Sequence, residues 1–226
     1  MEFGINDFAP VGCEDCKGCY SCCTEMGDSI IQDPFDYWIF SRNMKLQGGG
    51  RITFDMLVSE DGPWELSIHD GLLLPNIKMV EDGRCPFLSD KGRCTIHMIR
   101  SGLCRLFPLA RVFDDDSLSY ILLDEDLGCE KIGPEGRRGE SIRISKWLGY
   151  AEPDKYEKYQ ILWHSIKKKA SAYIESVNTE EACDFNVKFL NLFYADEYGD
   201  DFFGEFDNRC NLARGRYFCH GDGSDG

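Results

Sequence analysis

The sequence lacks long apolar runs, an excess of positive charge and a secretory leader. No apolar run approaches the ~18 residues that a membrane-spanning helix needs, so we expect no membrane association. Lys and Arg total 25 against 40 Asp and Glu, and the net charge of −15 argues against nucleic-acid binding. Residues 1–10 contain no basic residue and no apolar segment, so a secretory signal is not predicted and we expect a cytoplasmic protein.

Internal repeats and a dinucleotide-binding glycine motif are also missing. No GxGxxG follows a predicted strand, so a Rossmann-type site for a methyl donor is not expected. Gly48-Gly49-Gly50 is interpreted as a loop after a helix. With 42% hydrophobic and 13% aromatic residues over 226 positions, the chain has the composition of a folded protein with a substantial core.

Cysteine, in contrast, is abundant. The twelve cysteines are Cys13, Cys16, Cys19, Cys22, Cys23, Cys85, Cys94, Cys104, Cys129, Cys183, Cys210 and Cys219. In a reducing compartment, closely spaced thiols favour metal ligation over disulfides, and we interpret the first nine as metal ligands. The alternative is a set of oxidised pairs in an exported protein.

The spacing of the first cysteines favours a cluster over a single ion. Cys13, Cys16, Cys19 and Cys22 are separated by three successive CxxC steps. One CxxC pair supplies two ligands to one zinc ion, whereas successive steps reach several corners of an iron–sulfur cube and a remote cysteine completes it. Thiolates bind both metals, so zinc remains the alternative. The adjacent Cys22 and Cys23 either serve different sites or include one spare thiol.

Several cysteine blocks follow one another in the order and spacing of a known family. They are Cys16-x2-Cys19-x2-Cys22-Cys23, Cys85-Pro86-Phe87-Leu88, Gly92-Arg93-Cys94 with Ile96, Cys104-Arg105-Leu106-Phe107-Pro108, and Gly128-Cys129. On these blocks, residues 13–130 resemble the CxxCxxCC family, which is described as a zinc- or iron-chelating domain. The resemblance says little about residues 150–226.

Three departures from the family pattern leave the thiolates intact. His97 stands where the family usually has tyrosine, which makes it a further candidate ligand; Ser101 replaces a proline, and Cys13 is additional. The flagellin lysine N-methylases share these blocks and are considered iron–sulfur enzymes that use S-adenosylmethionine. The resemblance therefore implies metal binding, with protein-lysine methyl transfer as an alternative activity and S-adenosylmethionine as an alternative cofactor.

The number of thiols bounds the number of sites. Two four-iron clusters or two zinc ions need eight cysteines, so the nine predicted ligands allow one or two 4Fe-4S clusters. Arg105 and Arg93 are each adjacent to a predicted ligand, and we expect their guanidinium groups to offset the charge of a thiolate cluster. Substrate binding is the alternative role for Arg105.

Outside the cysteine blocks the predictions are structural. Cys183 is expected to be a buried thiol on a helix, while Cys210, Cys219 and His220 form either a small site or a mobile tail. The acidic, aromatic stretch at residues 196–207 is interpreted as a loop held to the core by its aromatic rings. The alternative interpretation is that this stretch forms a negatively charged surface that binds a basic partner.

The expected elements follow from caps, turns and periodicity. A helix begins after Asp33, with Phe35, Trp38, Ile39 and Met44 buried, and the glycine run ends it. Strands are expected at 64–69 and 72–80 around an Asp70-Gly71 turn, and at 118–123. A helix is expected over 154–177. A second helix is expected after residue 178, because Asn178 and Glu181 have the spacing of a capping box.

Together these features predict an α+β fold. Residues 1–149 form an irregular, cysteine-rich metal-binding core with short strands, and residues 150–226 form a helical extension with an acidic tail. We expect an iron–sulfur protein with a redox or enzymatic role, whose partner is a redox protein or a basic protein substrate. A zinc-structured module without turnover is the alternative. The sequence leaves open whether the chain is an enzyme.

Overall fold

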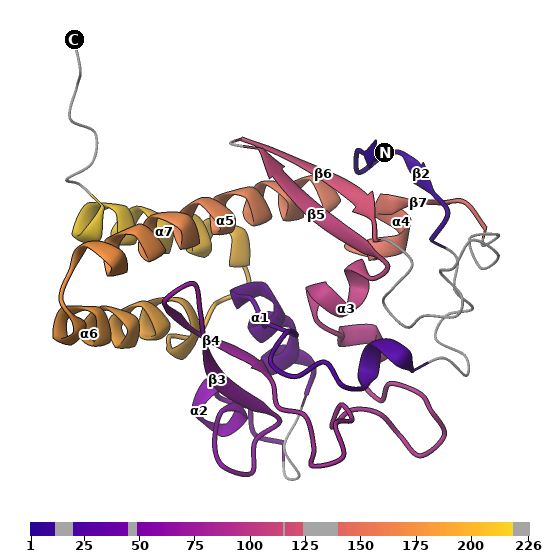
Figure 1. Ribbon diagram of the computed structural model, residues 1–226, viewed down its shortest axis with the longest axis horizontal. Helices are drawn as coiled ribbons and strands as arrows, with labels where there is room; N and C mark the ends of the chain where they lie inside the picture. Colours follow the sequence, from indigo (N-terminus) through magenta and orange to yellow (C-terminus); the bar gives the residue numbers. More distant parts are fainter. Residues whose placement is uncertain (12–19, 45–48, 115, 124–139, 219–226) are drawn as a thin grey trace.

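A computed structural model describes residues 1–11, 20–44, 49–114, 116–123 and 140–218. These residues form an α+β fold with small antiparallel sheets (Figure 1). The strands are β1 (Glu2–Phe3), β2 (Phe8–Ala9), β3 (Trp64–His69), β4 (Leu72–Ile77), β5 (Leu109–Asp114), β6 (Ser117–Leu122) and β7 (Ile142–Arg143). The α-helices are α1 (Pro34–Asn43), α2 (Phe54–Leu57), α3 (Gly102–Leu106), α4 (Ile144–Leu148), α5 (Pro153–Ser176), α6 (Thr179–Leu190) and α7 (Phe202–Tyr217). The described residues also contain two short 3₁₀ turns, η1 (Ser21–Cys23) and η2 (His97–Ile99), and a π-helical turn, η4 (Asn191–Ala195).

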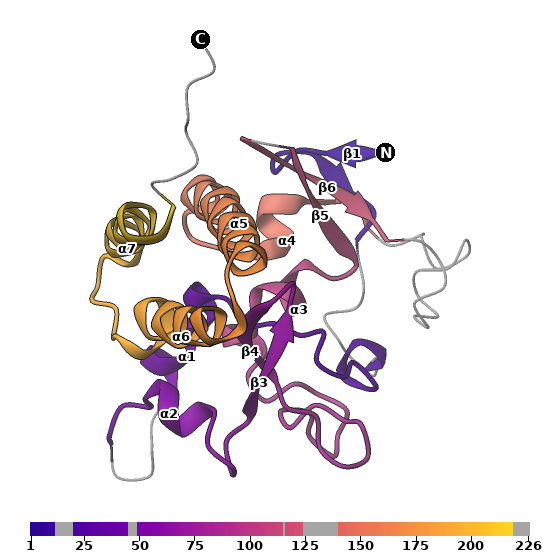
Figure 2. The ribbon, with the colours of Figure 1, turned by 60° about the vertical axis from the view of Figure 1, so that its left-hand side comes forward.

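The three long C-terminal helices lie together, and the β3–β4 hairpin packs against two of them, α5 and α6. Figures 1 and 2 show α5, α6 and α7 gathered on one side and the β5–β6 hairpin with the N-terminal strands on the other. The three sheets have the strand orders β1-β6-β5, β2-β7 and β3-β4. The α+β class expected from the sequence is therefore confirmed.

The β3–β4 hairpin forms as its turn residues predict. Asp70 has φ of 50° and Gly71 has φ of 81°, the left-handed values that a two-residue hairpin turn of this type requires at both positions. His69 pairs with Leu72 and Trp64 pairs with Ile77, so β4 ends before the predicted residue 80. The expected strand at 118–123 is also present, one residue earlier, as β6.

Helix α1 begins as predicted but differs in its buried face and its end. The Asp33 side chain accepts from the backbone N–H of Asp36, and Asp36 returns the bond to the Asp33 N–H. Tyr37 and Phe40 are buried along with Phe35, whereas the predicted Trp38 and Ile39 are half-buried. The helix ends at Asn43, because Met44 already has an extended backbone, so the glycine run is not its terminator.

Two long C-terminal helices match their predicted positions, and a third was missed. Helix α5 buries Tyr156, Tyr159, Trp163, Ile166 and Ala170, and Asn178 caps α6 by accepting from Glu181 N–H. Residues 202–217, interpreted from the sequence as a loop and a tail, instead form α7. Its buried positions Phe202, Phe206, Cys210 and Ala213 follow a helical period, and Asp201 caps it through Gly204 N–H. The correction arises because two glycines and many acids obscured that stripe.

A large aromatic core joins the two halves of the chain. Phe35 on α1 contacts rings of α5 and α7, with ring centroids 5.8 Å from Tyr159 and 5.0 Å from Phe202. Trp64 of β3 and Phe206 of α7 belong to the same buried cluster. A smaller core around Leu109 and Tyr120 lies under the N-terminal strands. Contacts of this kind bury 150–250 Å² per ring and dominate the stabilisation of such a core.

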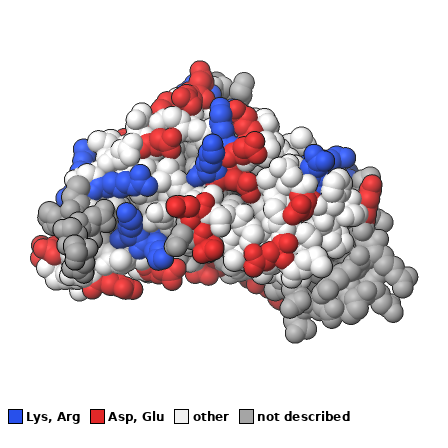
Figure 3. Space-filling model, turned by 90° about the horizontal axis from the view of Figure 1, so that it is seen from above, with Lys and Arg blue, Asp and Glu red and all other residues white. Residues whose placement is uncertain are grey.

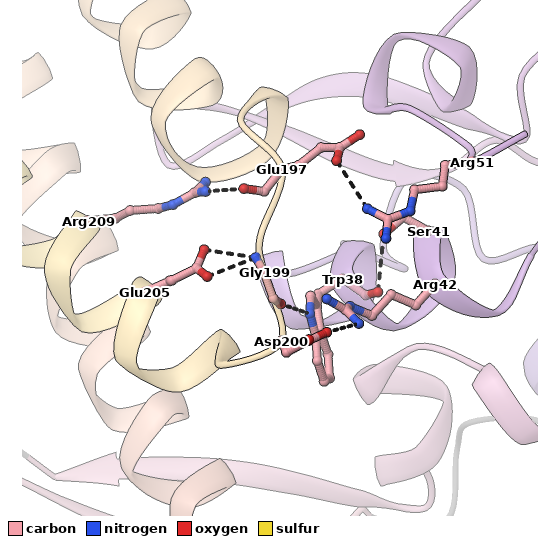
Figure 4. A network of polar contacts seen from close by, with 9 residues as sticks. All are labelled: Trp38, Ser41, Arg42, Arg51, Glu197, Gly199, Asp200, Glu205 and Arg209. Atoms are coloured by element: carbon pink, nitrogen blue, oxygen red, sulfur yellow. Dashed lines mark hydrogen bonds and ion pairs between the residues drawn. The ribbon is translucent and has the colours of Figure 1, made fainter.

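Charged groups tie the chain before α7 to α1. Figure 3 shows acidic and basic side chains intermingled over one face. Trp38 Nε1 donates to the carbonyl of Gly199 at 2.9 Å, and Arg42 pairs with Asp200 at 2.7 Å (Figure 4). Arg209 donates to the carbonyl of Glu197 at 2.8 Å. Tyr198 and Phe202 are buried, so the aromatic rings of this acidic stretch hold it to the core.

No helix among the described residues is long and apolar enough to cross a membrane.

Candidate metal centre

Backbone pairing brings the first two cysteine blocks together. The Cys85 N–H donates to the carbonyl of Cys23 at 2.8 Å, and the Glu25 N–H donates to Gly83 at 2.7 Å. Thr24 and Arg84 form the antiparallel bridge between these bonds. A short antiparallel ladder therefore fixes Cys23 beside Cys85, although some sixty residues separate them in the chain.

A second ladder folds Cys94 back toward Cys85. Thr95 N–H donates to the carbonyl of Phe87 at 2.8 Å, and Leu88 bridges to Cys94. The turn between them contains Gly92 with φ of 67°, a left-handed value that favours glycine. The Gly-Arg-Cys block thus supplies the turn that places its own cysteine.

Cys104 is positioned by helix α3. The Asp36 carboxylate on α1 accepts from the Gly102 N–H at 2.7 Å, so it satisfies a free donor at the start of α3. A Cβ at Gly102 would lie 2.6 Å from Tyr156 Oη, so glycine allows α3 to approach α5 this closely. The turn at η1 lies near α3 and the 79–96 loops (Figure 1).

Five thiols line one small cavity, which we term the thiol cavity. They are Cys22, Cys23, Cys85, Cys94 and Cys104. The cavity has a volume of about 40 Å³, and apolar side chains such as Ile30 and Met79 form much of its wall. All five thiols are half-buried, and none of the seven described cysteines forms a disulfide.

The polar neighbours of the thiols suit a thiolate-bound metal. The Ser101 hydroxyl is 4% exposed, lines the cavity beside Cys104 and has no oxygen or nitrogen partner. A hydroxyl in this place can donate to the Cys104 thiolate. His97 and Arg100 also line the cavity and contact each other. The donor set is therefore soft sulfur with hydrogen-bond donors around it, which fits iron or zinc.

Burial keeps these thiols protonated in the absence of metal. Desolvation raises the pKa of Cys104 to about 12, and it is also the largest cause of the raised pKa of Cys85. A hydrogen bond with Cys22 raises the pKa of Cys23, and burial adds to it. Because only the thiolate binds metal, each ligand must lose a proton when the metal enters.

Metal uptake by the metal-free protein is therefore expected to strengthen with pH. Between about pH 6.5 and 8.5, each thiolate ligand formed adds about tenfold to the apparent affinity per pH unit. Zinc titration against a competing chelator at both pH values measures this. Calorimetry in two buffers of different ionisation enthalpy counts the protons released. An affinity independent of pH, after correction for the chelator, would contradict the prediction.

Several predicted site residues lie outside the described residues. They are Cys13, Cys16, Cys19, Cys129, Cys219 and His220. Within the described ranges, no three Cys, His, Asp or Glu side chains are close enough together to hold one ion.

The two arginines adjacent to ligands differ in their surroundings. Arg93 is exposed. Arg105 donates to the carbonyls of Arg100 and Leu148 at 3.0 and 3.4 Å, and its guanidinium lies over the Tyr150 ring. These contacts tie α3 to the preceding loop and to α4. A role of either arginine toward a bound metal stays a prediction.

The other two described cysteines, Cys183 and Cys210, do not line the thiol cavity. Cys183 is exposed on α6, so the prediction of a buried thiol was wrong. Phe185 and Phe189 define the buried face of α6, and Cys183 falls two positions away from it. Cys210 is completely buried on α7. Sequence reasoning missed Ser101, which stands at one of the departures from the family pattern.

Thiols of several cysteine blocks therefore line one cavity on an α+β framework. A family model described as "Putative zinc- or iron-chelating domain" matches residues 15–128, and the chain therefore belongs to the CxxCxxCC family. The resemblance seen in the sequence is confirmed. No curated protein and no solved structure matches the chain.

Proposed function

We propose that the chain is an iron–sulfur protein whose cysteines hold at least one 4Fe-4S cluster. The placement of five thiols from four separate blocks around one cavity is the observation that carries the proposal. Cys13, Cys16 and Cys19 precede them at the CxxC spacing that reaches successive corners of a cube. Nine thiols in all are enough for two clusters.

The residues of the thiol cavity have separate tasks in this proposal. Cys85 and Cys94 supply thiolates from segments held by backbone pairing, Cys104 supplies one from α3, and Cys22 or Cys23 adds another. Ser101 donates to the Cys104 sulfur and lowers its charge density. The apolar wall excludes water. A bound cluster would supply one-electron chemistry or a Lewis-acidic iron.

The role that follows is electron transfer or a cluster-supported reaction in a reducing compartment, which we propose is the cytoplasm. Reduced thiols persist there, whereas an exported chain would oxidise them. The zinc alternative rests on the same thiolates and on the family description. Metal analysis separates the two possibilities.

Protein purified without oxygen from iron-replete cells is expected to contain iron and acid-labile sulfide. The content should reach about four irons per chain or more, with absorbance near 400 nm, because cysteinyl clusters absorb there. Colorimetric iron and sulfide assays and elemental analysis measure the content. Stoichiometric zinc without sulfide would refute the cluster and leave the zinc-structured module.

A further inference from the structure

A second cavity adjoins the thiol cavity. It has a volume of about 450 Å³, which is within the usual range for small-molecule sites. Cys22 and Cys104 line both cavities, so the two share a wall. The other walls come from α1, α3, β5 and α5, and side chains such as Leu106, Phe113 and Trp163 make them mostly apolar.

The two carboxylates that line this second cavity, Asp33 and Asp36, already accept hydrogen bonds from protein donors. Asp33 accepts from the Asp36 N–H at 2.9 Å and from Gln160 Nε2 at 2.7 Å. Asp36 accepts from the Asp33 N–H at 3.1 Å and from the Gly102 N–H at 2.7 Å. All four carboxylate oxygens therefore have donors, which come from the starts of α1 and α3 and from the Gln160 side chain within α5.

The two cationic side chains that line the cavity, Arg111 and Lys167, in contrast lack an anionic partner among the described residues. Arg111 on β5 gives one N–H to Tyr156 Oη at 2.8 Å, but its Nε is buried without a partner. Lys167 on α5 lies 5.8 Å from the centre of the Trp163 ring. Neither makes an ion pair with any side chain in the described parts of the chain. A buried donor without an acceptor costs free energy that a ligand could recover.

The two cations also interact unfavourably with each other. Burial lowers the pKa of the Lys167 ammonium, Asp33 opposes this, and the nearby Arg111 lowers it further. An anionic group between them would satisfy Arg111 Nε and offset the repulsion. It would take donors that Asp33 and Asp36, which have donors of their own, do not use.

We propose that this second cavity binds a small apolar molecule through a carboxylate held by Arg111 and Lys167. The apolar walls take the body of the ligand, and the shared wall at Cys22 and Cys104 brings it next to the metal centre. The site is built by Arg111, Lys167 and the apolar walls, so its existence is independent of which metal the thiols hold.

Octanoate is the probe, because it joins a carboxylate to an apolar chain that fits the cavity. Calorimetry on the full, anaerobically purified protein compares it with 1-octanol, octylammonium and inorganic phosphate. Octanoate is expected to bind at least about tenfold more tightly than each of the others. Phosphate lacks the apolar body, and octylammonium meets two cations. The experiment gives a result for zinc-loaded and for iron-loaded protein alike.

Lys167→Met and Arg111→Met are expected to weaken octanoate binding about tenfold or more and to leave 1-octanol unaffected. Lys168→Met is the matched control, since this neighbouring lysine is exposed and does not line the cavity. If Arg111→Met fails to fold, Lys167→Met still decides the question. The proposal is overturned if octanoate shows no saturable binding, or if octylammonium or 1-octanol binds as tightly. Equal losses in Lys167→Met and Lys168→Met would overturn it as well.

Discussion

Cys104→Ser is expected to strip most of the metal from the protein. Cys104 lies on α3 at the wall shared by both cavities, and a serine oxygen is a hard ligand that binds iron and zinc poorly. Losing a neighbouring hydrogen bond commonly costs 10–100-fold in metal affinity, so loss of the ligand itself should cost more than about 100-fold. Cys85→Ser should behave in the same way, because Cys85 also lines the thiol cavity and the change likewise replaces a soft sulfur ligand with a hard oxygen.

Two other cysteines provide matched controls for the same chemical change. Cys183→Ser replaces an exposed thiol on α6 and should keep both the metal and the stability within about 0.5 kcal/mol. Cys210→Ser places a hydroxyl in the closed core under α7 and should destabilise the fold by about 1–3 kcal/mol. The metal content should nevertheless be kept, which separates loss of ligand from loss of stability.

Metal and sulfide per chain, measured with a thermal melt for each variant, decide the assignment. If Cys183→Ser or Cys210→Ser lost metal while Cys85→Ser and Cys104→Ser kept it, the thiol cavity would not be the metal centre. The adjacent Cys22 and Cys23 are tested separately in the same series. Two four-iron clusters would use eight of the nine thiols. Either Cys13 or Cys23 should therefore be replaceable by serine without loss of metal.

Removing the metal is expected to loosen residues 20–31 and 79–106 while the aromatic core persists. These two segments are held by short ladders, the turns η1 and η2 and the five residues of α3, so little regular structure stabilises them alone. Amide hydrogen exchange there should accelerate by roughly 100-fold or more in the metal-free protein, since metal binding supplies the folding free energy.

The long helices serve as the internal control for that experiment. Buried rings of α5 and α7 pack against Phe35, and amides of α5 should change only a few-fold. Mass spectrometry of exchange in metal-loaded and chelated protein provides both measurements. Equal protection of residues 79–106 in the two forms would show that the metal does not organise the region. Uniform loss across α5 would show that it organises the whole chain.

Local signals in the sequence were sufficient to predict where several of the helices and the β3–β4 hairpin begin or turn. The Asp33 cap, the Asp70-Gly71 turn and the Asn178 cap each act within one turn of chain, and each forms where predicted. Such signals hold because their hydrogen bonds join residues at most a few positions apart. Errors arose on α6, where Cys183 lies two positions from the buried face, and on α7, where two glycines and many acids obscured the apolar stripe.

The cysteine blocks by themselves were sufficient to predict metal binding. Their number and spacing indicated a soft metal site, and membership of the family supports metal binding. Which thiols meet was decided only by tertiary contacts, above all the pairing of residues 23–25 with 83–85. The bond from Gly102 to Asp36, 66 residues away, adds to these contacts.

The second cavity could not be read from the sequence at all. Arg111 and Lys167 lie on a strand and a helix that no local pattern connects, and only packing of β5 against α5 brings them to one wall. Composition and spacing specify which ligands a chain offers. The positions of those ligands depend on burial and on long-range pairing, whose cost in chain entropy is recovered only when the whole core forms.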